Sequence, residues 1–198
     1  MLTKEDIKNA KKICFDLLSN YYHGFTIRHT LEMISLLDRI LPEINNKSIN
    51  LRKDVLVFSI FLHDIGRVKD EKNHAKISFE ITQNKFKHLI NEQDISIIKD
   101  CITNHSSGSL PISPEAKLLQ DLDKLSMLQP TIVLEYIFHI SKEINILKLP
   151  DNIIKYVDKN MINFNFPEVF NFYNTHNQDF IKKLKETLQK IKINMSCC

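Results

Sequence analysis

The chain of 198 residues is long enough for one domain with a substantial hydrophobic core. Hydrophobic residues make up 43% and charged residues 26%, a globular composition that excludes a wholly disordered or fibrous chain. The formal net charge of +3 is too small for a dedicated nucleic-acid binder, so no specific nucleic-acid partner is expected. With only three glycines there is no glycine-rich phosphate loop, and the composition favours long helices over a β-sandwich.

The four cysteines, Cys14, Cys101, Cys197 and Cys198, form neither a C-x-x-C pair nor a zinc-type spacing, which favours a reducing compartment. The N-terminal segment has no apolar core of signal-peptide length, and the apolar run at 55–62 is too short to span a bilayer. We therefore expect a cytoplasmic protein without a membrane partner. The terminal Cys-Cys resembles a prenylation acceptor, but a frayed tail is the favoured interpretation.

Helix start and stop signals recur along the whole chain. Thr3 and Thr26 are predicted to cap the first two helices, which end near Asn20 and at Pro42. Gly66 is predicted to stop a third helix that begins near residue 50. Further helices are predicted at about 75–87, 93–105, 114–127 and 130–143, and after Pro150 and Pro167. Because no strand alternation appears, we predict an all-α fold of about eight or nine helices in a single compact domain over 1–198.

The segment VFSIFLHDIGR, residues 57–67, ends an apolar helix with His63 and Asp64 side by side. A carboxylate against a dry core is unfavourable unless a cation or hydrogen bonds compensate it. Imidazole nitrogen and carboxylate oxygen together suit Mn, Fe, Co, Ni or Zn. For an isolated pair, simple hydrogen bonding to the backbone would be the favoured interpretation.

This pair is accompanied by further histidines and acids. His29 lies at the edge of an apolar helix face, and His105 continues the buried stripe of Ile95, Ile98 and Ile102. Asp121 and Asp123 flank another apolar stripe, and periodicity does not decide which of them points inward. His74 opens its own helix, where it can cap the helix, face solvent or bind a metal.

The order H…HD…D on helices resembles the HD superfamily of metal-dependent phosphohydrolases. The resemblance covers about residues 24–127, and this part of the chain would form the HD core. The helices of 130–195 are expected to pack on that core. The segments that carry the resemblance are HGFTIRHTLEM, FLHDIGR, NHAKISFEI, ITNHSSG and LLQDLDKL. SSGSLPISPEAKLLQDLDKL also resembles the small bacterial branch, whose members hydrolyse nucleoside triphosphates. The chain departs from that branch in SMLQPTIV, where a second Asp and a Gly-rich turn are usual.

The resemblance implies a metal site and residues that face the substrate. The metal ligands would be His29, His63, Asp64 and Asp123, with Asp123 preferred over Asp121 because the family's acid directly precedes a basic residue. His74 and His105 match two histidines of a second ion site bridged by Asp64; phosphate binding or proton transfer beside one ion is the alternative for both. Arg67 and Lys124 would face substrate phosphates. The catalytic set would comprise Asp64, His105, Lys124 and Arg67.

The function implied is hydrolysis of a phosphoanhydride or phosphoester of a nucleotide by a metal-activated water, with one or two ions of Mn, Fe, Co, Ni, Mg or Zn per chain. The partner would be a small phosphorylated molecule, either a nucleoside triphosphate or a dinucleoside polyphosphate. One alternative is a metal- and nucleotide-binding regulatory module without turnover. Another is an all-α interaction protein whose histidines only pack. The oligomeric state stays open, with a homodimer among the alternatives.

Overall fold

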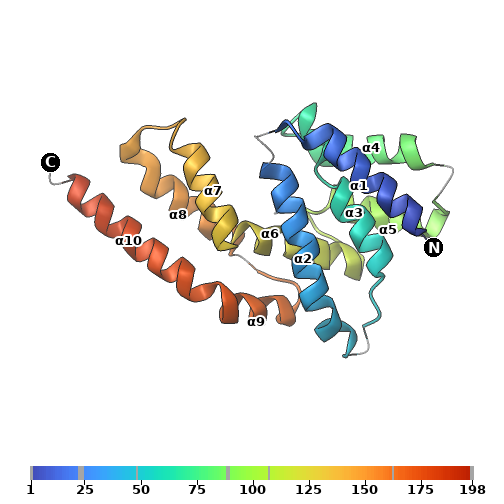
Figure 1. The fold of residues 1–198 in the computed structure, drawn as a ribbon. Coiled ribbons are helices and arrows are strands. Elements are labelled where there is room, and N and C mark those ends of the chain that lie inside the picture. Colours follow the sequence, from blue (N-terminus) through green and yellow to red (C-terminus); the bar gives the residue numbers. More distant parts are fainter. Residues whose placement is uncertain are drawn as a thin grey trace. The chain divides into compact units, whose positions relative to one another are not determined.

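A computed structural model describes residues 2–21, 25–47, 49–87, 90–106, 108–161 and 163–196 of the chain. Within these residues all regular structure is helical, with ten α-helices, two short 3-10 helices and no strand (Figure 1). The predicted all-α class is confirmed, and the helix count slightly exceeds the predicted eight or nine. The predicted break at Gly24, Ser48 in the next loop, and the terminal Cys197 and Cys198 lie outside the described residues.

The chain forms two compact units, residues 1–123 and 124–198. The first holds α1 (Lys4–Leu18), α2 (Phe25–Asn45), α3 (Lys53–Leu62), η2 (Ile65–Val68), α4 (His74–Phe86) and α5 (Glu92–Thr103). The helix α6 (Pro114–Met127) begins in the first unit and ends in the second. The second holds α7 (Pro130–Ile140), η3 (Ile146–Lys148), α8 (Leu149–Asn160), α9 (Pro167–His176) and α10 (Gln178–Ser196). The single domain over 1–198 therefore stays a prediction.

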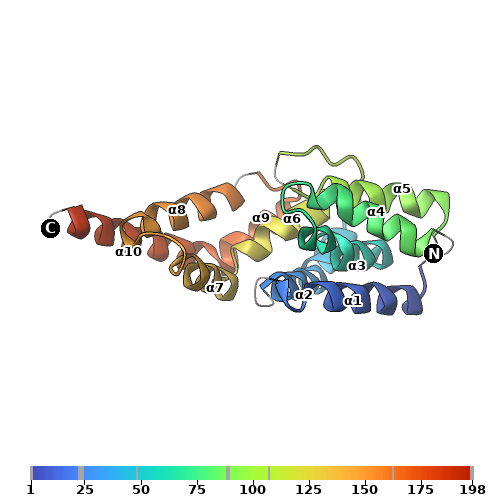
Figure 2. The same ribbon diagram turned by 90° about the horizontal axis from the view of Figure 1, so that it is seen from above.

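In the first unit, α3 is the central element. It lies between the layer of α1 and α2 and the layer of α4 and α5 (Figure 2), and it contacts all four helices. Its apolar side chains are buried on every face, including Val55, Leu56, Phe58, Ile60 and Leu62. Burying such a side chain completely contributes roughly 1.5–3 kcal/mol each. The C-terminal end of α3 consequently lies inside the unit, where its next two residues become part of the core.

Local capping signals place the starts of α1 and α6, whereas Thr26, the predicted cap of the second helix, lies inside α2. Thr3 accepts a hydrogen bond from the backbone N–H of Asp6 at 3.1 Å, and its own N–H donates to the Asp6 carboxylate at 2.8 Å. This reciprocal pair is a capping box, and it confirms Thr3 as the predicted cap. Ser113 Oγ accepts from the N–H of Ala116 at 3.2 Å, at the predicted start of α6.

The predicted end of the second helix at Pro42 is wrong. The helix α2 continues through Pro42 to Asn45, and the Pro42 carbonyl accepts from the N–H of Asn46 at 3.2 Å. A proline removes one helical hydrogen bond but leaves its own carbonyl able to accept one. The last turn is stabilised by Ile44, which is fully buried.

The segment after Pro167 forms two helices where one was predicted. The break falls at Asn177, which is fully buried and separates α9 from α10. Its side-chain amide donates to the carbonyl of Leu128 at 3.1 Å, within the second unit. An asparagine that finds such a partner away from the helix favours ending the helix at that position.

Gly66 does not act as the predicted helix stop. It lies inside η2, and among the described glycines only Gly108 has a positive φ, of 95°. A Cβ at position 66 would lie 2.3 Å from the carbonyl oxygen of His74 and 2.7 Å from the backbone nitrogen of Ser78. Gly66 also donates its N–H to Ser78 Oγ at 2.8 Å. Glycine is needed here because the backbone of α4 packs directly against η2.

Replacing Gly66 with alanine is expected to lower the free energy of unfolding by about 3 kcal/mol, because the new methyl group collides with backbone atoms that cannot rotate away. The matched control is Gly108→Ala, where no atom lies within 4 Å and only the positive φ is unfavourable. That variant is expected to lose about 1 kcal/mol. Urea unfolding followed by circular dichroism measures both values. Equal losses would contradict the close approach of α4.

No helix in the described part of the chain combines the length and the hydrophobicity needed to cross a bilayer.

Cys14 and Cys101 are free, buried thiols. Burial raises the pKa of the Cys14 thiol to about 12, so it packs as a small apolar group.

Candidate metal centre

Two neighbouring side chains that can bind a metal lie in the core of the first unit, directly after the end of α3. His63 is the C-terminal cap of α3 and Asp64 directly precedes η2. The exposed fraction is 0% for His63 and 2% for Asp64. Because the apolar helix ends inside the unit, both polar groups need partners away from water.

A first group of ligand atoms forms around His63. The ligand atoms of His29, His63 and Asp64 all lie within 4.8 Å of one another. His63 Nε2 is 3.5 Å from Asp64 Oδ2 and 4.0 Å from Asp123 Oδ1, and His29 Nε2 is 3.0 Å from the same Asp123 oxygen. Helices α2, α3 and α6 thus bring together the four residues that the resemblance implies as metal ligands.

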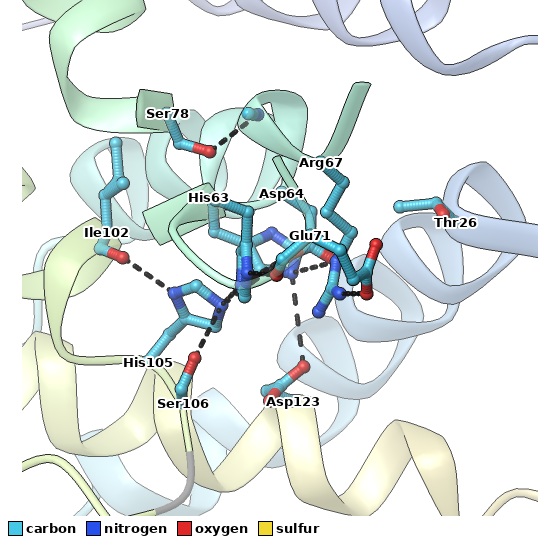
Figure 3. A network of polar contacts seen from close by, with 12 residues as sticks. Thr26, His63, Asp64, Arg67, Glu71, Ser78, Ile102, His105, Ser106 and Asp123 are labelled. Carbon is cyan, nitrogen blue, oxygen red and sulfur yellow. Dashed lines mark hydrogen bonds and ion pairs between the residues drawn. The ribbon is translucent and has the colours of Figure 1, made fainter. Parts of the chain in front are cut away.

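A second group shares Asp64 with the first. Asp64 Oδ1 lies 3.3 Å from His74 Nε2 and 3.5 Å from His105 Nε2, and these two nitrogens are 3.0 Å apart. Figure 3 shows His105 beside His63 and Asp64, with Asp123 opposite. His74 comes from the start of α4 and His105 from the loop after α5. The carboxylate of Asp64 therefore stands between two groups of imidazole nitrogens.

Backbone carbonyls orient three of the imidazole rings. The Nδ1 atoms of His63, His74 and His105 lie 2.7, 2.8 and 2.7 Å from the carbonyl oxygens of Ile60, Glu71 and Ile102, respectively. A carbonyl only accepts, so each Nδ1 carries a proton and each ring directs its Nε2 toward Asp64 or its neighbours. Carbonyl partners of this kind hold metal-binding histidines in one tautomer.

The charges of the cluster suit a cation. Burial lowers the pKa of His63 to about 4, which keeps this ring neutral near pH 7. Burial alone would raise the pKa of Asp64, but the neighbouring His63 and the permanently charged Arg67 hold it well below its usual value. For Asp123 burial is likewise outweighed, here by His29, and its pKa falls to about 2. Both acids are therefore carboxylates at neutral pH.

Within the described residues, the buried atoms His63 Nε2 and Asp64 Oδ1 lack a hydrogen bond of normal geometry. Leaving such a group unsatisfied costs roughly 1–3 kcal/mol. A metal ion would satisfy both, since neutral imidazole nitrogen and carboxylate oxygen are ligands of Mn, Fe, Co, Ni and Zn. The residues present therefore fit a divalent metal.

The predicted phosphate-facing cations lie in different units. Arg67 Nε donates to Asp64 Oδ2 at 2.7 Å, so the guanidinium is next to the cluster. Lys124 belongs to the second unit, where its ammonium donates to the carbonyl of Asn163 at 3.1 Å. A role of Lys124 toward substrate stays a prediction. Asp121 is fully buried on α6.

Glu71 is part of the cluster's surroundings, although sequence reasoning did not identify it. Its carboxylate accepts from Arg67 Nη1, and its backbone carbonyl orients His74. The only sequence signal is the spacing of four residues between Arg67 and Glu71, with opposite charges. That spacing brings side chains together on helices, and here the chain runs from a 3-10 helix into a bend.

The fold and the cluster define an all-helical protein with a buried histidine–aspartate centre suited to divalent metal. The HD domain family model matches residues 26–128, just over half of the chain. The chain belongs to the HD domain family, and the recognised superfamily is confirmed. A comparison with curated proteins found no match, and a comparison with solved structures found none either. Family and cluster together support a metal-dependent hydrolase.

Proposed function

We propose that this HD domain protein hydrolyses a phosphoanhydride or phosphoester bond of a nucleotide, with a nucleoside triphosphate or a dinucleoside polyphosphate as substrate. The observation that carries the proposal is the buried Asp64 carboxylate, which two groups of imidazole nitrogens share. The likeness of residues 106–125 to a branch that acts on nucleoside triphosphates supports the choice of a nucleotide.

Each residue of the centre would have a distinct task. His29, His63, Asp64 and Asp123 would hold one ion, and His74 and His105 would join Asp64 for a second. The bound metal would supply a water of lowered pKa and would neutralise charge on the phosphoryl group. Arg67 already contacts Asp64, and a guanidinium can bind phosphate oxygens through a planar fork of N–H donors. The buried side chains of α3 exclude bulk water, which strengthens these charge interactions.

The test is a hydrolysis screen of protein purified without chelator and supplied with Mn²⁺, Co²⁺, Ni²⁺ or Mg²⁺. Nucleoside mono- and triphosphates and a dinucleoside tetraphosphate are the substrates, and both free phosphate and nucleotide products are quantified by chromatography. Metal-dependent turnover of one nucleotide class is the expected result. Bound metal without turnover would favour the regulatory module. Absence of metal would favour the interaction protein.

The number of ions is tested by His105→Ala. This change removes a nitrogen from the second group and leaves the first intact, so the metal content is expected to fall from about two ions per chain to about one. Metal is measured by inductively coupled plasma mass spectrometry after saturation and desalting. The exposed His176 outside the cluster supplies the control His176→Ala, which should keep the full metal content. A wild-type protein that saturates at one ion would contradict the second site.

A further inference from the structure

Arg67 is held through two of the three nitrogens of its guanidinium. Nε donates to Asp64 Oδ2 at 2.7 Å and Nη1 donates to Glu71 Oε1. Within the described residues all hydrogen bonds of the Arg67 side chain come from Nε and Nη1, and 21% of the side chain is exposed. In Figure 3 the guanidinium lies between the Asp64 and Glu71 carboxylates. Nε faces the cluster and Nη1 faces Glu71, so Nη2 and the second N–H of Nη1 are the donors that remain for an anion.

Glu71 is in turn held by Tyr21, at the end of the first helical segment. The Tyr21 hydroxyl donates to Glu71 Oε2, while Arg67 binds the other carboxylate oxygen. The side chain of Glu71 is about half exposed, and 50 residues separate the tyrosine from the glutamate in sequence. A chain of contacts therefore runs from Tyr21 through Glu71 and Arg67 to Asp64.

We propose that Glu71, held by Tyr21, is a positioning residue that orients Arg67 for a phosphate group of the substrate. An arginine side chain has many rotamers, and fixing two of its donors in advance reduces the entropy lost when its other donors bind. The inference rests on the proposed function, because a phosphorylated substrate supplies the anion that Arg67 would receive.

The direction in which Glu71→Gln changes phosphate binding distinguishes a positioning role of Glu71 from an effect of its negative charge alone. The carboxylate of Glu71 repels a phosphate, so if only its charge mattered, Glu71→Gln would strengthen phosphate binding. If Glu71 positions Arg67, the same substitution weakens binding, because the amide replaces a charge-assisted hydrogen bond by a weaker one. Tyr21→Phe removes one hydroxyl and changes no charge at neutral pH, so it should also weaken binding.

The experiment measures binding of inorganic phosphate by calorimetry to Mn²⁺-loaded protein from which free metal has been removed. We expect the dissociation constant to rise about tenfold in Glu71→Gln and about threefold in Tyr21→Phe. The Mn²⁺ content should not change, because the carbonyl that orients His74 belongs to the backbone. Glu80→Gln is the matched control: it removes the same charge from an exposed site on α4 and should leave the dissociation constant unchanged.

A double-mutant cycle tests whether Glu71 acts through Arg67. Once Arg67→Ala is present, adding Glu71→Gln should cause no further loss of phosphate binding. Additive losses, or unchanged or tighter binding in Glu71→Gln, would overturn the positioning role alone. Loss of Mn²⁺ in Glu71→Gln would also overturn it, since Glu71 would then support the metal centre. Metal-loaded wild-type protein that binds no phosphate would overturn the proposed function and, with it, this role.

Discussion

Replacing Asp64 with asparagine is expected to abolish metal retention and to reduce hydrolysis roughly a thousandfold or more. Asp64 is the residue common to both groups of ligand atoms, and it also receives the Arg67 guanidinium. An asparagine has nearly the same shape but brings no charge to an ion. Its amide nitrogen replaces one of the two carboxylate oxygens and does not coordinate a metal. Metal content by mass spectrometry and product formation by chromatography measure the two effects.

The control for this prediction is Asp38→Asn, the same chemical change on the surface of α2, where the side chain is about half exposed and pairs with Lys53. This variant should keep both metal and activity. Far-UV circular dichroism verifies that both proteins remain helical. A folded Asp64→Asn protein with the full metal content would refute the metal centre.

Replacing Asp123 with asparagine is expected to lower hydrolysis by roughly two to three orders of magnitude. The carboxylate lies 3.0 Å from His29 Nε2 and 4.0 Å from His63 Nε2. Its low pKa of about 2 keeps it charged over the working pH range, and the amide loses that charge. Initial rates at saturating metal, together with the metal affinity, measure the loss.

Asp121→Asn provides the comparison, since it makes the same change two residues earlier on α6. This variant should retain most of the activity. The reverse ranking of the two variants would show that Asp121 is the metal ligand, and equal losses would show that neither position alone is decisive.

Sequence alone determined the helical class and several helix starts, because these depend on interactions within a few residues. Thr3 and Asp6 form their capping box inside one turn, and Ser113 caps α6 in a similar way. His63 and Asp64 could also be identified from the sequence as candidate ligands, because adjacent polar groups at the end of an apolar helix need partners. The family follows from the order of such motifs along the chain.

Tertiary structure alone decided the features that depend on distant parts of the chain. Position 66 has no room for a side chain because the backbone of α4 packs against it. The sequence alone does not show whether a glycine ends a helix or allows another helix to approach closely. Asn177 ends α9 within the second unit, where its amide reaches the carbonyl of Leu128.

The surroundings of the metal centre are non-local for the same reason. Asp123 lies beside His29 although 94 residues separate them, and helical periodicity leaves both acids of α6 at the edge of an apolar stripe. Glu71 and Tyr21 carry no motif, and their contacts with Arg67 and with each other exist only after α1, η2 and α4 have packed. Sequence thus determined which side chains could bind a metal, whereas packing of the helices decided which of them meet and in which orientation, because hydrogen bonds and metal coordination act only over a few ångströms.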